Sequence, residues 1–126
     1  MGNTDSKITN VYRDYLFQLS QNDDTSNNEF YTDFLNVTAN LQLHTFNTVI
    51  TNSVLRKIIC LNPQNYVNLL DFTISNFIDL FTNFQQTQST KRQVNFFFKQ
   101  VITSIRIITK LTPILYEHIQ EGHTIL

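Results

Sequence analysis

The first seven residues carry a motif whose spacing implies a chemical modification. Residues 1–6 read M-G-N-T-D-S, which matches the N-myristoylation pattern M-G-x-x-x-[ST], and Lys7 follows. Removal of Met1 exposes the amine of Gly2, and glycine has no side chain that would block the narrow active site of the transferase. The enzyme recognises the Ser6 hydroxyl deeper in the same site. We expect a lipid on Gly2, with Ser6 and Lys7 as recognition residues. The alternative is an ordinary unmodified N-terminus.

The other candidates for chemistry do not combine into a catalytic site. His44, His118 and His123 are scattered, and the last two stand five residues apart, which is a poor spacing for two metal ligands on one helix face. The chain contains no dinucleotide-binding glycine motif, P-loop or nucleophile elbow. Its single cysteine, Cys60, lies in an apolar run and is expected to be a buried structural thiol. We therefore expect no enzymatic activity, metal, cofactor or small-molecule substrate.

A basic stripe is the second candidate surface. Arg92, Lys99 and Arg106 stand seven residues apart, so they share one face of a helix. Such a stripe is most often a solvated surface, and the functional alternative is contact with anionic lipid headgroups or an acidic partner. The whole chain has 9 lysines and arginines against 10 acids. This balance argues against nucleic-acid binding, which needs a dense basic surface.

Length and composition predict one helix-rich domain. The 126 residues include two glycines and two prolines, so breaks are rare, and the chain is long enough to bury a core. One cysteine, no apolar run that could span a bilayer and no apolar segment near the N-terminus predict a cytoplasmic location. We divide the chain into a flexible myristoylation segment at 1–7 and a helical domain at 8–126.

Apolar residues recur at three- and four-residue steps, which predicts helices along most of the chain. We expect helices at about 7–20, 28–41, 53–61, 63–84 and 90–110, whereas 42–51 is ambiguous. Asn62-Pro63 marks the clearest start, because asparagine caps helices and proline fits their first turn. Pro113 is expected to end or kink the last helix, because its ring clashes with the carbonyl four residues earlier.

The two long helices must lie antiparallel, because a turn of about five residues joins them. Both carry more apolar surface than one neighbour covers, which is typical of an armadillo- or HEAT-like α-solenoid unit, although no internal repeat is present. We therefore expect the domain to be the N-terminal part of a longer solenoid. A helical wheel places two sets of apolar residues on different faces of these helices. We expect the set that faces away from the partner helix to be less buried, namely Phe72, Ile74, Leu80, Phe96 and Ile107. The set that faces the partner helix is Phe77, Phe81, Val101 and Ile105.

The opening heptapeptide at 1–7 resembles the start of the high-temperature-induced dauer-formation protein family, relatives of dymeclin. Three later segments agree in order and approximate spacing. They are the acidic-aromatic segment 28–34, with Tyr31 where the family usually has tryptophan; Arg56 followed by Pro63-Gln64-Asn65 and Leu69; and the segment 113–117. The resemblance spans nearly the whole chain. Family members are much longer, so we expect this chain to correspond to their N-terminal part, as a fragment, a truncated product or an early-stopping relative.

The resemblance implies a non-enzymatic, myristoylated peripheral protein of Golgi membranes that acts in protein sorting and secretory-vesicle formation. Its partners would be the membrane, through myristoyl-Gly2, and other proteins. The alternative is a soluble α-helical interaction module without a lipid anchor. Mass spectrometry of the N-terminus distinguishes the two hypotheses.

Overall fold

Six α-helices make up the part of the chain that the structure describes. The structure is a computed structural model, and it describes residues 3–21, 28–86 and 90–123. The helices are α1 (Asn3–Gln21), α2 (Asn28–Ala39), α3 (Leu43–Val49), α4 (Asn52–Leu61), α5 (Pro63–Gln86) and α6 (Lys91–Gln120). No strand occurs within these residues, so the predicted all-α fold is confirmed.

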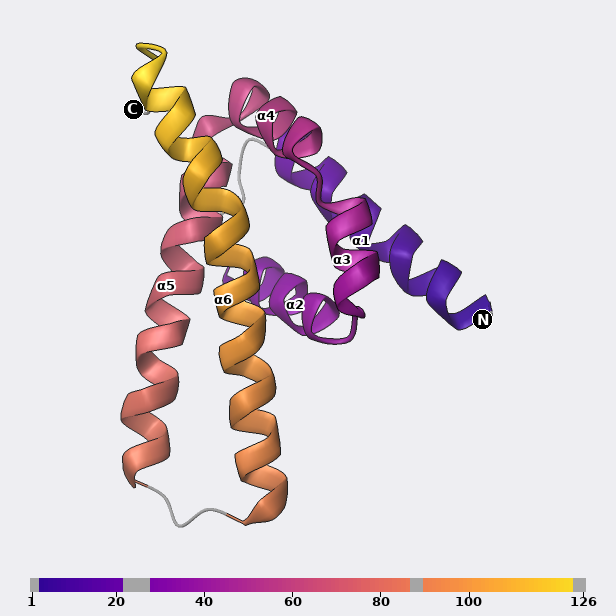
Figure 1. The fold of residues 1–126 in the computed structure, drawn as a ribbon, viewed down its shortest axis with the longest axis vertical. Coiled ribbons are helices and arrows are strands. Elements are labelled where there is room, and N and C mark those ends of the chain that lie inside the picture. Colours follow the sequence, from indigo (N-terminus) through magenta and orange to yellow (C-terminus); the bar gives the residue numbers. More distant parts are fainter. Residues whose placement is uncertain (1–2, 22–27, 87–89, 124–126) are drawn as a thin grey trace.

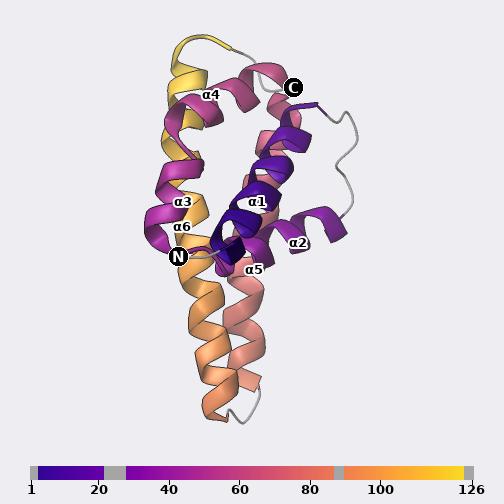
Figure 2. The same ribbon diagram turned by 90° about the vertical axis from the view of Figure 1, so that its right-hand side faces the viewer.

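α5 and α6 form an antiparallel hairpin that runs the length of the molecule (Figure 1), as the sequence predicts. α1 to α4 lie beside one end of this hairpin only, and the end where α6 begins extends beyond them (Figures 1 and 2). We call the first region the body and the second the arm. We divide the hairpin where burial changes: the body comprises α1–α4 with residues 63–73 and 100–120, and the arm comprises residues 74–86 and 90–99.

Polar caps begin both helices of the hairpin. Asn62 ends α4 and begins α5, because its N–H donates to the Ile58 carbonyl at 2.8 Å while its Oδ1 accepts from the Asn65 N–H at 3.2 Å. At α6, the Thr90 N–H donates to Gln93 Oε1 at 2.8 Å, and the Gln93 N–H donates to Thr90 Oγ1 at 3.2 Å. This reciprocal pair is a capping box. The caps satisfy donors that a helix start leaves unpaired.

Aromatic rings from three helices form the centre of the body's core. Tyr12 of α1 and Phe34 of α2 stack with ring centroids 4.9 Å apart, and Phe46 of α3 lies 6.5 Å from Tyr12. Tyr12 Oη and Thr38 Oγ1 are hydrogen-bonded at 3.0 Å, and Thr38 also donates to the Phe34 carbonyl at 2.7 Å. Burial raises the pKa of Tyr12. Its neutral hydroxyl is therefore satisfied inside the core by a single partner.

We expect Pro113 to end or kink the last helix, and α6 continues through it, so the first alternative is wrong. Proline removes the N–H that would bond to the Thr109 carbonyl, which inside a helix costs about 3 kcal/mol. The residues on either side are nevertheless held by the body. Leu111 and Ile114 are buried, and Tyr66 of α5 donates its hydroxyl to the Leu111 carbonyl. Tertiary packing thus outweighs the local cost of the proline.

The first helix begins earlier than predicted. α1 starts at Asn3 rather than at Lys7, so the backbone of residues 3–7 is helical where the sequence predicts a segment that precedes the first helix. Residues 3–6 are Asn, Thr, Asp and Ser, which are favoured at helix N-termini. The ambiguous stretch at 42–51 holds the short helix α3, whose Phe46 and Val49 are buried.

Burial along α6 corrects part of the wheel prediction. Ile107, which we expect to be among the less buried residues, is 0% exposed, whereas Ile105 is 45% exposed. The cause is that α6 contacts α2 and α4 as well as α5, and Ile107 belongs to the core cluster that these helices share. Phe96 is 59% exposed, as expected. Phe81 is 41% exposed, contrary to the prediction, because it lies on the arm.

Cys60 is exposed, so the prediction of a buried structural thiol is also wrong. α4 buries Leu55, Ile58 and Ile59 against the body. Successive residues of a helix point about 100° apart, so the residue after Ile59 turns away from that face. The apolar run around Cys60 therefore does not imply burial of every member.

Candidate functional site

The predicted lipidation segment lies at the start of α1. Gly2 is outside the described residues. The backbone of Ser6 belongs to α1, but its side chain is not among those described, and Lys7 is exposed. The structure therefore places Lys7 at the surface of the first helix and leaves the lipidation prediction as a prediction.

Two of the three residues of the predicted basic stripe bind the body of the same chain. Lys99 Nζ donates to Asn40 Oδ1 at 3.1 Å, and Arg106 Nη1 donates to the Leu41 carbonyl at 3.4 Å. Both acceptors lie in the short connection between α2 and α3. Arg92 is exposed in the first turn of α6, on the arm. The stripe thus positions the α2–α3 connection through two members, and Arg92 is the member that projects from the arm.

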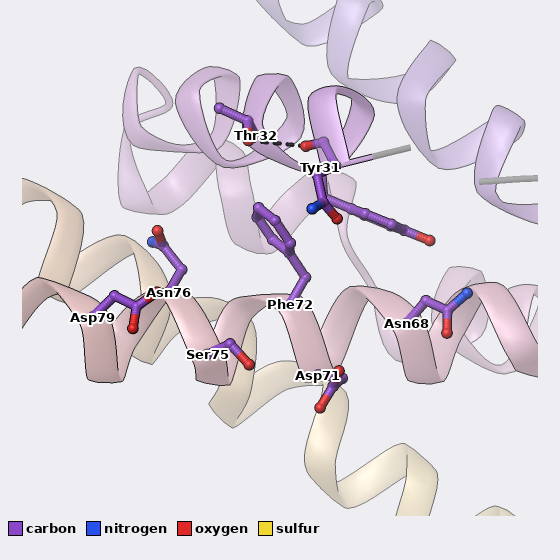
Figure 3. A pocket seen from close by; sticks show the side chains of 9 residues that line it. Tyr31, Thr32, Asn68, Asp71, Phe72, Ser75, Asn76 and Asp79 are labelled. Carbon is purple, nitrogen blue, oxygen red and sulfur yellow. Dashed lines mark hydrogen bonds between the residues drawn. The ribbon is translucent and has the colours of Figure 1, made fainter. Parts of the chain in front are cut away.

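A groove of about 630 Å³ lies between α2 and α5 (Figure 3). Tyr31 of α2 and Phe72 of α5 form its floor, with ring centroids 5.5 Å apart. Phe72 and Asn76 point from α5 toward α2, whereas Asp71 points away from α2 (Figure 3). The remaining lining residues are all polar: Asn28, Thr32, Asn68, Asp71, Ser75, Asn76 and Asp79. The groove therefore combines an aromatic floor with a polar, partly anionic rim.

The two helices that form the groove carry acids and no bases. Together, α2 and α5 contain Glu29, Asp33, Asp71 and Asp79 and not one lysine or arginine. α4 has two basic residues and α6 has five, with Glu117 as the single acid in these two helices. A chain whose net charge is only −1 thus gathers acids on the groove helices and bases on α4 and α6.

Asp71 and Asp79 are the exposed charges of the groove. Within residues 3–21, 28–86 and 90–123, neither carboxylate has an ion-pair or hydrogen-bond partner. They are eight residues apart on α5, which places their α-carbons about 12 Å apart along the helix axis. Sequence reasoning did not identify these residues as a site. The available signal was a 24-residue helix with two aspartates and no basic residue to neutralise them.

The segments that carry the family resemblance meet in the body. Arg56 of α4 and Glu117 of α6 form a bidentate ion pair, with Nε–Oε1 at 2.9 Å and Nη2–Oε2 at 3.2 Å. Their mutual hydrogen bond is the main reason why the pKa of Arg56 is raised and the pKa of Glu117 is lowered. Asn65, which is buried, donates Nδ2 to the Leu19 carbonyl of α1 at 2.9 Å. These residues therefore join α1, α4, α5 and α6 to one another.

The described residues include neither a metal-binding cluster nor a helix that could span a membrane. They contain no group of three or more His, Cys, Asp or Glu side chains that could hold a metal ion. The rings of His118 and His123 stack with centroids 4.5 Å apart, and Glu121 Oε2 lies 3.6 Å from His123 Nε2. None of the helices in this part of the chain is both long and apolar enough to cross a bilayer.

The fold and its contacts define an all-helical protein in which residues of the resembling segments bond one helix to another. The family model described as Hid1, high-temperature-induced dauer-formation protein, matches residues 1–124. The chain therefore belongs to the high-temperature-induced dauer-formation protein family. No curated protein and no solved structure matches it.

Proposed function

We propose that this chain is a non-enzymatic, N-myristoylated peripheral protein on the cytoplasmic face of Golgi membranes, where it acts in protein sorting and secretory-vesicle trafficking. The observation that carries the proposal is the family match, which begins at residue 1 and so includes Gly2 in its M-G-x-x-x-[ST] pattern. The Golgi location and the trafficking role are what membership of this family implies.

A lipid on Gly2 cannot anchor the chain by itself. One myristoyl group binds a membrane with an association constant of about 10⁴ M⁻¹, which gives only reversible attachment. Lys91 and Arg92 are exposed on the arm, and a base near an anionic surface adds about 1 kcal/mol. Two such contacts would strengthen binding by about thirtyfold, which still falls short of stable anchoring. Protein partners must therefore supply the rest.

Mass spectrometry of the N-terminus tests the anchor. The chain is coexpressed with an N-myristoyltransferase, and its intact mass and N-terminal peptide are measured. We expect loss of Met1 and one myristoyl group on Gly2, less modification in Ser6→Ala and none in Gly2→Ala. A wild-type N-terminus that is free or acetylated under these conditions would contradict the proposal.

A soluble helical interaction module is the second candidate, and the early start of α1 favours it. Four residues of helix span about 6 Å, whereas four extended residues span about 13 Å. A transferase that reads both Gly2 and Ser6 in a narrow site requires the extended form, with which the helix from Asn3 competes. If a synthetic peptide of residues 2–12 is myristoylated and the whole chain is not, the soluble module is the correct function.

We also propose that the α5–α6 hairpin is a unit of an armadillo- or HEAT-like solenoid. The support is the exposed apolar surface on both hairpin helices, which includes Ile74, Ile78, Phe96, Phe98 and Ile102. Sequencing of the transcript beyond the codon for Leu126 tests this. A continued reading frame that encodes helices with the same two-sided apolar pattern supports it. A stop codon at that point, together with a chain that stays monomeric at high concentration, contradicts it.

A further inference from the structure

We propose that the groove between α2 and α5 is a docking site for a basic segment of a partner protein, which carries two arginines or lysines about four residues apart. The groove helices belong to the folded body and arm, and the N-terminal lipid is not part of the site. The inference therefore goes beyond the proposed function and does not depend on it.

Charge is the first reason. The rim of the groove holds two acids, Asp71 and Asp79, and neither groove helix carries a lysine or arginine that could neutralise them. Asp71 and Asp79 are exposed and have no ion-pair or hydrogen-bond partner among the described residues. Complementary charge speeds association and selects against acidic partners. A positively charged ligand is thus the one that this surface favours.

The floor of the groove favours arginine in particular. The Phe72 ring is half-buried and is held by Tyr31 behind it, so one part of the ring remains open to the groove. A planar guanidinium stacks on such a ring, and its aliphatic stem covers apolar surface. Ser75 and Asn76 lie between the two carboxylates and have no side-chain partner in the part of the chain that the structure describes. They are available to hydrogen-bond the backbone of a bound segment.

The separation of the carboxylates selects the kind of segment. Their α-carbons are about 12 Å apart along α5, a distance that an extended peptide covers in about four residues. This distance is too long for both carboxylates to hold one cation, because Ca²⁺ and Mg²⁺ bind oxygen at about 2.0–2.6 Å. Because Asp71 points away from α2 (Figure 3), the segment must follow the outer side of α5 at that end, and two separate basic side chains on one extended segment fit the spacing.

A second copy of this chain is a poorer occupant. Two members of its basic stripe, Lys99 and Arg106, already bond to Asn40 and Leu41 of their own chain, and docking through them would break those hydrogen bonds. The exposed bases Lys91 and Arg92 are adjacent in the first turn of α6, so they do not match two carboxylates eight residues apart on α5. We therefore assign the groove to a different protein.

Fluorescence anisotropy with a defined probe tests the assignment. The probe is a fluorescein-labelled peptide of glycine and serine with two arginines four positions apart, and the control peptide has glutamine at both positions. Purified unlipidated chain is titrated into each peptide at low and at high salt. We expect binding of the arginine peptide only, and weaker binding as salt rises, because surface charges are then screened.

The double variant Asp71→Asn/Asp79→Asn is expected to weaken binding by about tenfold, because each exposed charge pair contributes up to about 1 kcal/mol. The matched control is Asp14→Asn/Glu121→Gln, which removes the same charge from positions outside the groove and is expected to bind like the wild type. Circular dichroism confirms that both variants fold.

Three results would overturn the assignment. One is equal binding of the glutamine peptide, and another is equal loss in the control variant. The third is no peptide binding combined with wild-type self-association that Asp71→Asn/Asp79→Asn abolishes in sedimentation equilibrium, which would make the occupant a second copy. None of these results bears on the lipid, so failure here and failure of the proposed anchor are separate findings.

Discussion

The body and the arm are built from the same two long helices, yet only the body buries them. Among the side chains of α5 that the structure describes, every buried one lies in the body: Asn65, Tyr66, Leu69, Leu70 and Thr73. Among the described side chains of the arm, Phe97 alone is buried. The apolar pattern of the two helices continues into the arm, so the difference arises from neighbours and not from the helices themselves. Stability is thereby concentrated in the body, and surface available to partners is concentrated outside it.

The arm is held together by its own phenylalanines. Phe97 of α6 contacts Phe81 and Phe84 of α5, with ring centroids 5.2 and 4.1 Å apart, and Phe77 lies 5.2 Å from Phe81. Each such pair contributes about 0.5–1.5 kcal/mol beyond its buried area. The contacts join the two helices of the arm but leave their outer faces uncovered.

Truncation of a phenylalanine in each region gives the largest expected contrast. Phe34→Ala, in the body, should lower the free energy of unfolding by about 3–5 kcal/mol, because it leaves a cavity beside Tyr12. Phe96→Ala, in the arm, should lower it by less than about 0.5 kcal/mol, because that side chain is 59% exposed. Urea denaturation followed by circular dichroism measures both. Similar losses in the two variants would abolish the distinction between the regions.

A buried amide provides the next contrast. Asn65→Ala should lower the free energy of unfolding by about 1–3 kcal/mol, because the Leu19 carbonyl then loses its side-chain donor inside the body. Asn76→Ala, at the groove, should lower it by less than about 0.5 kcal/mol, because Asn76 is only half-buried and has no partner among the described residues. The same denaturation experiment applies. An equal effect of the two changes would contradict a special role for Asn65.

The Arg56–Glu117 ion pair gives a smaller, pH-dependent effect. The pKa of Glu117 is lowered in the folded chain, so its contribution is present above the ordinary value of 4.5 and disappears as pH falls through the folded value. Glu117→Gln should therefore lower the Tm by roughly 1–3 °C at pH 7, and the difference should shrink as the pH falls below 4.5. Asp79→Asn, which removes an unpaired carboxylate, should leave the Tm unchanged at pH 7 and at pH 3. A Tm difference that persists undiminished at pH 3 would exclude the ion pair as its cause.

Local sequence signals predicted the helices of the hairpin well. Asn62-Pro63 and the polar residues before α6 act within one turn, so their caps can be read directly from neighbouring residues. The all-helical fold and the antiparallel pair follow from periodicity and from the short connection. Pro113 shows the limit of this reasoning, because the contacts that keep α6 continuous come from α5, far away in the chain.

The candidate sites depended on contacts that no local pattern encodes. Ile107 and Ile105 have equal hydrophobicity, and only the position of α2 and α4 against α6 decides which is buried. Lys99 and Arg106 looked like a free basic surface, yet they bond to the α2–α3 connection. The groove arises where α2 crosses α5, so its lining could not be assembled before the two helices were placed together.

Membrane fractionation of Gly2→Ala in cells tests the central claim most directly, namely that the body folds by itself and the lipid on Gly2 attaches it to membranes. We predict that the wild type distributes to the membrane fraction and that Gly2→Ala moves to the soluble fraction. The purified variant should keep the helical circular dichroism spectrum and the unfolding midpoint of the wild type. If Gly2→Ala still sediments fully with membranes, the lipid is not the anchor and the account is wrong.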